Sequence, residues 1–284
     1  MIIFVNENIC KMKRLLLLLI ICVSALPLVA RQGYYELIDS AECCIKEKNW
    51  EKAEHFLRTV LVSYPDDNNN SLILSNLATV QRYQGKLAEA VKNYTYAINM
   101  TPNAVTLIKN RASLYLDMDS VNDALEDYER VLLIDETDEE SRYYHGILSL
   151  RIDDMNAAKK DFDHILFYNP ASGLGREGLG LWFMKRHNYI EAVKYFTEIL
   201  KQRPSSLLLS KRAECYLAMK KINDAGDDIR KAIELSPDDG YLYVLRAKLN
   251  KLRYNAEDVE RDIRLAEQCG ISRELAEQIL NSEK

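Results

Sequence analysis

A four-residue block recurs seven times along the chain, and its spacing constrains the fold more than any other feature. The last residues of the seven blocks are Ala53, Ala90, Ala124, Ala158, Ala192, Ala225 and Val259. Successive blocks lie 37, 34, 34, 34, 33 and 34 residues apart. A sustained period of about 34 residues is typical of a repeat architecture, in which each copy packs mainly against its neighbours.

Each copy also keeps small and large apolar residues at fixed distances from the block. In the fifth copy, Gly180 lies twelve positions before the last residue of the block, Phe196 four positions after it, and Ile199 three positions further on. Offsets of four and seven place three residues on one helix face, and a small residue lets a second helix approach closely. In five of the seven copies a proline follows twelve positions after the block and stops the helix, as Pro204 does here. Each copy therefore predicts a pair of antiparallel helices.

The pattern resembles the tetratricopeptide repeat, which places Trp, Leu-Gly, Tyr, Ala, Phe and Pro at fixed positions in 34 residues. The fifth copy matches best, through Leu179-Gly180, Phe183, Ala192, Phe196 and Pro204. The chain departs from the pattern because no copy has the early Trp and because three copies have Arg in place of Leu before the small residue, at Arg111, Arg212 and Arg246. The resemblance implies an all-α fold, a right-handed superhelical solenoid of about seven helix pairs with a C-terminal capping helix.

The resemblance covers about residues 34–271, and it divides the chain as follows. We expect a tetratricopeptide repeat domain over 31–284, with repeats near 34–67, 71–104, 105–138, 139–172, 173–205, 206–239 and 240–271 and a cap over 272–284. In the cap, Ser272 is the expected N-cap residue. Leu275, Ile279 and Leu280 are expected to form the apolar face that closes the stack.

The first 30 residues have the layout of a secretory signal peptide. A basic segment that ends at Arg14 precedes the apolar run 15–29, and Ala30 supplies a small residue at the end. The run is shorter than the roughly 20 residues that a membrane-spanning helix needs. We therefore expect residues 1–30 to be a signal peptide that sends the protein to the periplasm or cell envelope. An uncleaved anchor is the alternative, and Met12 is an alternative start.

The resemblance also implies a binding site, because the first helices of tetratricopeptide repeats line a concave groove that receives a peptide or a partner segment. The family's groove positions fall on Asn76, Arg82, Tyr83, Lys109, Asn110, Tyr143, Tyr144, Arg151, Leu181, Lys185, Lys211, Tyr241, Leu245 and Lys248. The carboxyl-terminal part of this set is apolar with a basic excess. It predicts a partner segment that is apolar or amphipathic and bears acidic residues. Alternatively, the leucines pack between neighbouring copies.

Motifs for chemistry are weak. Residues 173–178 spell G-x-G-x-x-G, but a dinucleotide loop needs a preceding strand, whereas this segment lies in the first helix of a copy. We expect its glycines to make this the softest helix of the stack.

Asp161, Asp163 and His164 are expected to form a solvated charged face. No His or Cys pair has metal-ligand spacing, so no metal or cofactor is expected. We expect buried free thiols at Cys43, Cys44, Cys215 and Cys269.

These observations favour a non-catalytic scaffold or adaptor that binds a protein or peptide partner. The net charge of −5 provides no electrostatic attraction for nucleic acid or for an anionic membrane surface. We find no nucleophile with a base and no paired carboxylates, so the chain is not expected to be an enzyme. Membrane contact is expected only through an uncleaved signal segment. The alternative function is a structural subunit of an envelope or secretion assembly.

Overall fold

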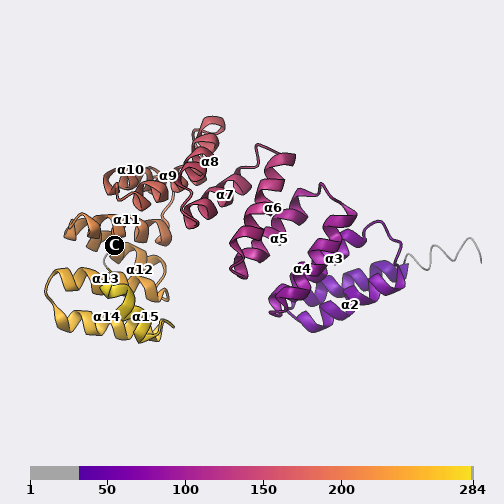
Figure 1. The fold of residues 1–284 in the computed structure, drawn as a ribbon. Coiled ribbons are helices and arrows are strands. Elements are labelled where there is room, and N and C mark those ends of the chain that lie inside the picture. The colour runs from indigo at the N-terminus through magenta and orange to yellow at the C-terminus, as the bar shows by residue number, and fades with distance from the viewer. Residues whose placement is uncertain (1–31, 283–284) are drawn as a thin grey trace, which may run out of the picture. The chain divides into compact units, whose positions relative to one another are not determined.

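The computed structural model describes residues 32–282, which form helices and connecting turns with no strand among them (Figure 1). Residues 32–46 are helical and precede the other helices. These are α2 (Trp50–Ser63), α3 (Asn70–Tyr83), α4 (Leu87–Met100), α5 (Val105–Asp117), α6 (Val121–Ile134), α7 (Glu139–Arg151), α8 (Met155–Tyr168), α9 (Gly173–Lys185), α10 (Tyr189–Leu200), α11 (Ser206–Ala218), α12 (Ile222–Leu235), α13 (Gly240–Leu252), α14 (Ala256–Gln268) and α15 (Arg273–Asn281). The expected signal peptide lies outside the described residues.

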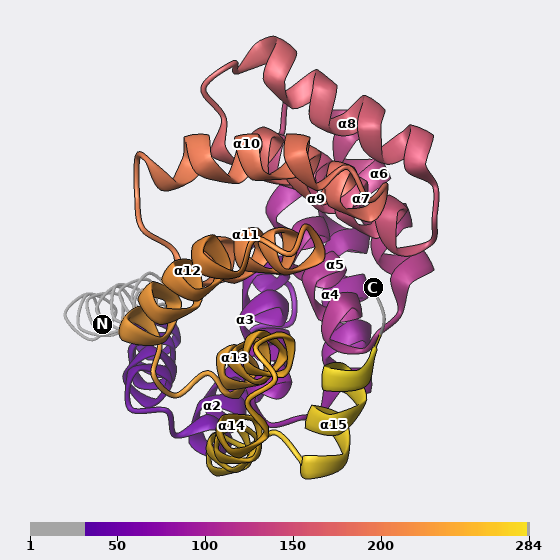
Figure 2. The ribbon, with the colours of Figure 1, turned by 90° about the vertical axis from the view of Figure 1, so that its left-hand side faces the viewer.

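The helices form two compact units, one ending at Ile134 and the other beginning at Asp135. In the first unit, α3 packs on α4 and α5 on α6. In the second unit the pairs are α7 with α8, α9 with α10, α11 with α12, and α13 with α14. Figure 2 shows α10 to α14 as successive layers of one stack. The predicted all-α repeat solenoid is confirmed.

The turn inside each helix pair has the same backbone geometry in every copy. Its residue with positive φ lies five positions before the last residue of the block, at Lys48, Gly85, Asp119, Asp153, His187, Lys220 and Tyr254. Glycine occupies this position only once, so the other copies hold a side chain in a conformation that costs about 1 kcal/mol. The tight turn is therefore imposed by the packing of the two helices that it joins.

The block and the large residue after it form the core of each pair. Ala158 and Ala192 are fully buried, and so are Phe162 and Phe196, four positions further on. The ring of Phe162 lies so close to α9 that a Cβ built on Gly178 would come within 2.1 Å of it. The same ring would lie 2.6 Å from a Cβ on Gly146 of α7. Gly178, the last glycine of the G-x-G-x-x-G segment, thus serves close helix packing, whereas a Cβ on Gly173 would meet no atom within 4 Å.

Buried ion pairs explain why arginine replaces leucine in three copies. Arg111 donates two hydrogen bonds to Asp127 at 2.6 and 2.8 Å, and Arg212 donates two to Asp228 at 2.7 Å each. The third arginine, Arg246, donates two hydrogen bonds to a single oxygen of Asp262, at 2.7 and 3.0 Å, and the other oxygen accepts from Asn250 at 2.8 Å. Each aspartate lies sixteen residues after its arginine, on the second helix of the pair, and is buried. The pairs join the two helices of a copy.

The fourth copy has a related cluster, which corrects one expectation. His145 takes the place of the arginine, and its Nδ1 lies 2.6 Å from Asp161 Oδ2. Arg142 lies 3.3 Å from the other oxygen of the same carboxylate. Asp161 is only 5% exposed, so it does not belong to a solvated charged face. Its neighbour Asp163 is exposed, as expected.

The carboxyl-terminal helix α15 closes the second unit. The Ser272 side chain accepts a hydrogen bond from the backbone N–H of Leu275, which confirms it as the N-cap. Ala276 is the residue of α15 that becomes buried, among Val244, Ala247 and Ile263. Leu275 stays exposed, so the predicted closing face was wrong at this position.

The four cysteines of the described chain are free thiols in different surroundings. Cys44 is buried, as expected, and so is Cys215. Cys43 is exposed and Cys269 is partly exposed, so the expected burial was wrong for these two. Within residues 32–282, no helix combines the length and apolar character that crossing a membrane requires.

Candidate binding surface on the first helices

The first helices of the pairs in the second unit, α7, α9, α11 and α13, present side chains that are only partly covered by packing. We call this surface the first-helix face and define it by six half-buried residues, Tyr143, Ile147, Leu181, Met184, Leu217 and Tyr241. Each of them packs against one of the cores between neighbouring helices. The face is therefore apolar, and its exposed parts are held in place from below.

Two tyrosines of this face connect successive first helices. The Tyr143 hydroxyl on α7 donates a hydrogen bond of 3.0 Å to Glu177 on α9. Burial raises the pKa of Tyr143, and the negative charge of Glu177 raises it further. Tyr241 on α13 has the same relation to Glu214 on α11, and its pKa is raised for the same reasons. Both phenols therefore stay protonated and donate to carboxylates.

Two lysines that were assigned to the groove, Lys185 on α9 and Lys211 on α11, are already engaged with carboxylates, which reduces the expected basic excess. Lys211 Nζ lies 2.9 Å from Glu214 and 5.7 Å from the centre of the Tyr241 ring. Lys185 Nζ donates to the Leu150 carbonyl at 2.6 Å and lies 3.1 Å from Asp153. These lysines are paired with carboxylates, so little net positive charge is left at the centre of the face.

Other residues assigned to the groove have less uniform surroundings. Leu245 is 1% exposed and packs with Ala213 and Ile229, so it cannot contact a partner and its assignment was wrong. Lys248 donates to Ser282 at 3.2 Å. In the same unit, Arg151 is exposed and Tyr144 is half-buried. Leu181, the other leucine of the predicted set, keeps part of its side chain accessible.

The first unit carries the other predicted residues, and these lie on α3 and α5. Tyr83 is 65% exposed, and its ring stacks on Trp50 with 4.6 Å between ring centres. Arg82 forms an ion pair with Asp117 and donates to Ser113. Asn76 on α3 is exposed, and Lys109 and Asn110 on α5 are half-buried. Here the accessible surface is mainly polar.

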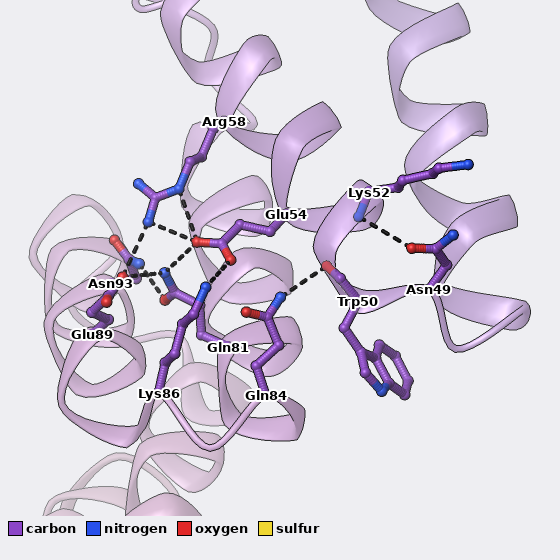
Figure 3. A network of polar contacts seen from close by, with 10 residues as sticks. All are labelled: Asn49, Trp50, Lys52, Glu54, Arg58, Gln81, Gln84, Lys86, Glu89 and Asn93. Atoms are coloured by element: carbon purple, nitrogen blue, oxygen red, sulfur yellow. Dashed lines mark hydrogen bonds and ion pairs between the residues drawn. The ribbon is translucent and has the colours of Figure 1, made fainter.

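A buried network in the first unit was not predicted from the sequence (Figure 3). Glu54 on α2 accepts hydrogen bonds from Arg58 at 2.9 Å, Lys86 at 2.8 Å and Gln81 at 3.2 Å. Burial alone would raise the pKa of Glu54, but these three donors outweigh burial and lower the pKa to about 2. Asn93 donates to Gln81 at 2.7 Å. The network joins α2, α3 and α4, so its role is structural.

Within residues 32–282, no group of three or more His, Cys, Asp or Glu side chains could hold a metal ion. His145 is engaged with Asp161, and His187 lies 2.8 Å from the hydroxyl of Tyr189. The first-helix face offers apolar contact through its half-buried side chains and hydrogen bonds through groups such as Tyr143 and Glu177.

Comparisons with known proteins agree with this architecture. A family model described as tetratricopeptide repeat matches residues 208–239. A tetratricopeptide repeat protein from Parabacteroides merdae ATCC 43184 is 33% identical, with a TM-score of 0.78 over 88% of this chain and 98% of that chain. PilW, a widely conserved type IV pilus biogenesis factor, is 19% identical, with a TM-score of 0.64 over 75% of this chain and 100% of that chain.

Pseudomonas aeruginosa pilF is 16% identical, with a TM-score of 0.56 over 73% of this chain and 94% of that chain. At the identities of PilW and pilF, the likeness is one of fold alone. The identity of 33% and the nearly complete coverage of the Parabacteroides protein show family membership in addition to a shared fold. The chain belongs to the tetratricopeptide repeat family.

Proposed function

We propose that the protein is an exported interaction scaffold whose second unit binds a segment of a partner protein on the first-helix face. Tetratricopeptide repeat proteins bind protein or peptide partners, and membership of this family supports the general role. The observation that supports the location is the set of half-buried apolar side chains on α7, α9 and α11. Such side chains gain free energy when a partner covers them.

The packing beneath the face makes it suitable for recognition. Leu181 contacts the core beneath α7 and α9 and also the core between α9, α10 and α11. Its conformational freedom is thus restricted before a partner arrives, so less entropy is lost on binding. Burying the exposed half of one leucine contributes about 1 kcal/mol. Four or five such anchors contribute about 4–5 kcal/mol, which corresponds to a weak, reversible complex with a dissociation constant on the order of 0.1–1 mM.

The paired lysines change the expected partner. Because Lys185 and Lys211 face Asp153 and Glu214, an acidic partner segment would have to compete with these carboxylates. We therefore propose that the segment is recognised mainly through apolar side chains. Its hydrogen-bonding groups would meet the carboxylates of Glu177 and Glu214, which accept from tyrosines.

Photo-crosslinking in living cells tests the location. A photo-reactive amino acid is placed at Met184 on the first-helix face, and in a matched variant at Phe167, which is 78% exposed on α8. We expect a discrete crosslinked product from position 184 and none from position 167. A product that forms equally well from both positions, or only from 167, would place the binding surface elsewhere.

Export is tested separately. The basic and apolar segments within residues 1–30 support secretion, and cleavage after Ala30 would give a mature chain that begins at Arg31. Amino-terminal sequencing of the protein from fractionated cells measures this directly. An intact amino terminus on protein recovered from the cytosol would contradict the proposal.

A further inference from the structure

An open cavity of about 360 Å³ lies between the carboxyl-terminal end of α10, the start of α11 and the end of α12, and none of the residues that define the first-helix face lines it. Leu200, Leu209, Pro204 and Leu235 give it apolar walls. Its volume is at the lower end of the range for small-molecule sites, about 300–1,000 Å³. The cavity is large enough for a small ligand and too small for a folded partner.

The opening follows from the length of the fifth copy. That copy is followed by a spacing of 33 residues, and α10 ends at Leu200, eight positions after Ala192. The second helices α4, α6, α8 and α12 all end ten positions after the last residue of their blocks. Lys201 and Pro204, in the segment that follows the shortened α10, line the cavity together with Leu209 and Leu235.

The first unit contains the same framework with the opening bridged. Thr95, Arg111 and Asp127 make the same hydrogen bonds as Thr197, Arg212 and Asp228, with 2.9 Å between the arginine and the threonine hydroxyl in both cases.

The two frameworks differ one turn further along the second helix. In the first unit, Arg130 donates to the carbonyl of Pro102 at 2.5 Å and so spans the place that corresponds to the cavity. Its counterpart in the second unit is Lys231, and Pro102 corresponds to Pro204. Among the described residues Lys231 makes no hydrogen bond or ion pair, and the cavity beside it stays open.

The charges around the cavity favour an anion. Lys201 is paired with Glu198 at 2.6 Å, and Arg212 is neutralised by Asp228. The one carboxylate of the lining, Glu234, is paired with Arg230 at 3.0 Å. Lys231 is therefore the cation of the lining whose charge is left unbalanced by a neighbour in the described chain. An ammonium group beside apolar walls suits a ligand that has one negative charge and a hydrocarbon body.

We propose that this cavity binds a small apolar carboxylate, with its hydrocarbon part against Leu200, Leu209 and Leu235 and its carboxylate at Lys231. The assignment rests on the shortened α10, on the unbridged opening and on the unbalanced charge. It is independent of partner binding on the first-helix face. We expect the ligand to be a free small molecule, since a cavity of about 360 Å³ has room for one hydrocarbon group with its carboxylate.

Titration of the purified protein with 4-phenylbutyrate tests the proposal. Leucine methyl groups are labelled for NMR, and the dissociation constant is measured from the shifts of Leu200, Leu209 and Leu235. We expect the shifts to concentrate on these leucines. The uncharged 4-phenylbutyramide is expected to bind at least fivefold more weakly. Absence of saturable shifts, shifts centred on other leucines, or equal affinity for the amide would overturn the proposal.

Two variants of one exposed residue separate charge from shape. Lys231→Gln removes the cation and is expected to weaken binding of 4-phenylbutyrate at least fivefold. Lys231→Arg keeps the charge but supplies the guanidinium that bridges the first unit, so it is expected to reach Pro204 and abolish binding. Lys160→Gln, an exposed lysine on α8, is the control and should bind normally.

Helical circular dichroism and the unfolding temperature verify that each variant is folded. If Lys231→Arg binds as well as the unchanged protein, the bridging argument is wrong. A peptide that ends in Leu-Phe and binds more tightly than 4-phenylbutyrate would contradict a free small molecule as the ligand.

Discussion

Replacing Gly178 by alanine should destabilise the protein, although the same change stabilises an ordinary helix. In a helix interior, alanine is favoured over glycine by about 1 kcal/mol. A Cβ at Gly178, however, would lie 2.1–2.6 Å from three atoms of the Phe162 ring. The ring has little room to move, because a Cβ built on Gly146 of α7 would also lie only 2.6 Å from it. Overpacking of this kind costs about 3 kcal/mol, so the net loss is about 2 kcal/mol.

Urea unfolding followed by circular dichroism measures this difference. Gly173→Ala is the matched control, because a Cβ there meets no atom within 4 Å and we expect unchanged or slightly higher stability. The double variant Gly178→Ala with Phe162→Leu should lose less than the sum of the two single changes, because the smaller side chain relieves the overlap. If Gly178→Ala stabilises the protein by about 1 kcal/mol, the close packing of α8 and α9 has been misjudged.

Two further predictions concern buried charges. Asp228→Asn should lower the free energy of unfolding by about 3–5 kcal/mol, because it leaves the Arg212 guanidinium buried without a charged partner. The double change Arg212→Leu with Asp228→Tyr copies the Leu179–Tyr195 pair of the fifth copy. In urea unfolding it should restore most of the stability that Asp228→Asn loses. A double variant no more stable than Asp228→Asn would show that the pair is needed as such. Because the folded-state pKa of Glu54 is about 2, below its ordinary value of 4.5, the stability that it contributes is complete above pH 4.5 and disappears as the pH falls towards 2. The pKa shift corresponds to about 3 kcal/mol of stability at most. In Glu54→Gln, the free energy of unfolding should therefore fall less steeply as the pH decreases from 4.5 to 2. If it falls as steeply as in the unchanged protein, other groups cause the acid sensitivity.

The repeat period carried most of the information about the fold. It identified the buried alanines and the large residues four positions after them because these positions make the same contact in every copy. Ala158 and Phe162 in α8, and Ala192 and Phe196 in α10, lie as the period predicted. The helix pairs follow from this register, since a 34-residue unit buries its apolar faces only against its neighbours.

The buried aspartates were missed, although the sequence contains a signal for them. Arg or His precedes the small residue in the third, fourth, sixth and seventh copies, and the same four copies have Asp three positions after the block. The second and fifth copies have Leu at the first place and Asn93 or Tyr195 at the second. Reading the two positions together would have predicted that Asp161 is buried, whereas charge alone suggested a solvated face.

The binding surface was less predictable, because a groove position in the register is not always accessible. Leu245 and Gly178 occupy the same place in their copies as the half-buried Lys211, yet both are buried. Their exposure depends on the side chains of the neighbouring copy, which differ along the chain. The partners of Lys185 and Lys211 could not be deduced for the same reason, because they depend on rotamers and on the turn at Asp153.

Direct measurement of partner affinity tests the proposed recognition most sharply. The segment captured by crosslinking from position 184 is synthesised, and its dissociation constant is measured for the unchanged protein, for Met184→Glu and for Phe167→Glu. Met184→Glu introduces a charge on the half-buried first-helix face, so we predict at least tenfold weaker binding, while Phe167→Glu on α8 leaves the affinity unchanged. Equal effects of the two changes, or weaker binding for Phe167→Glu alone, would contradict recognition by the first helices.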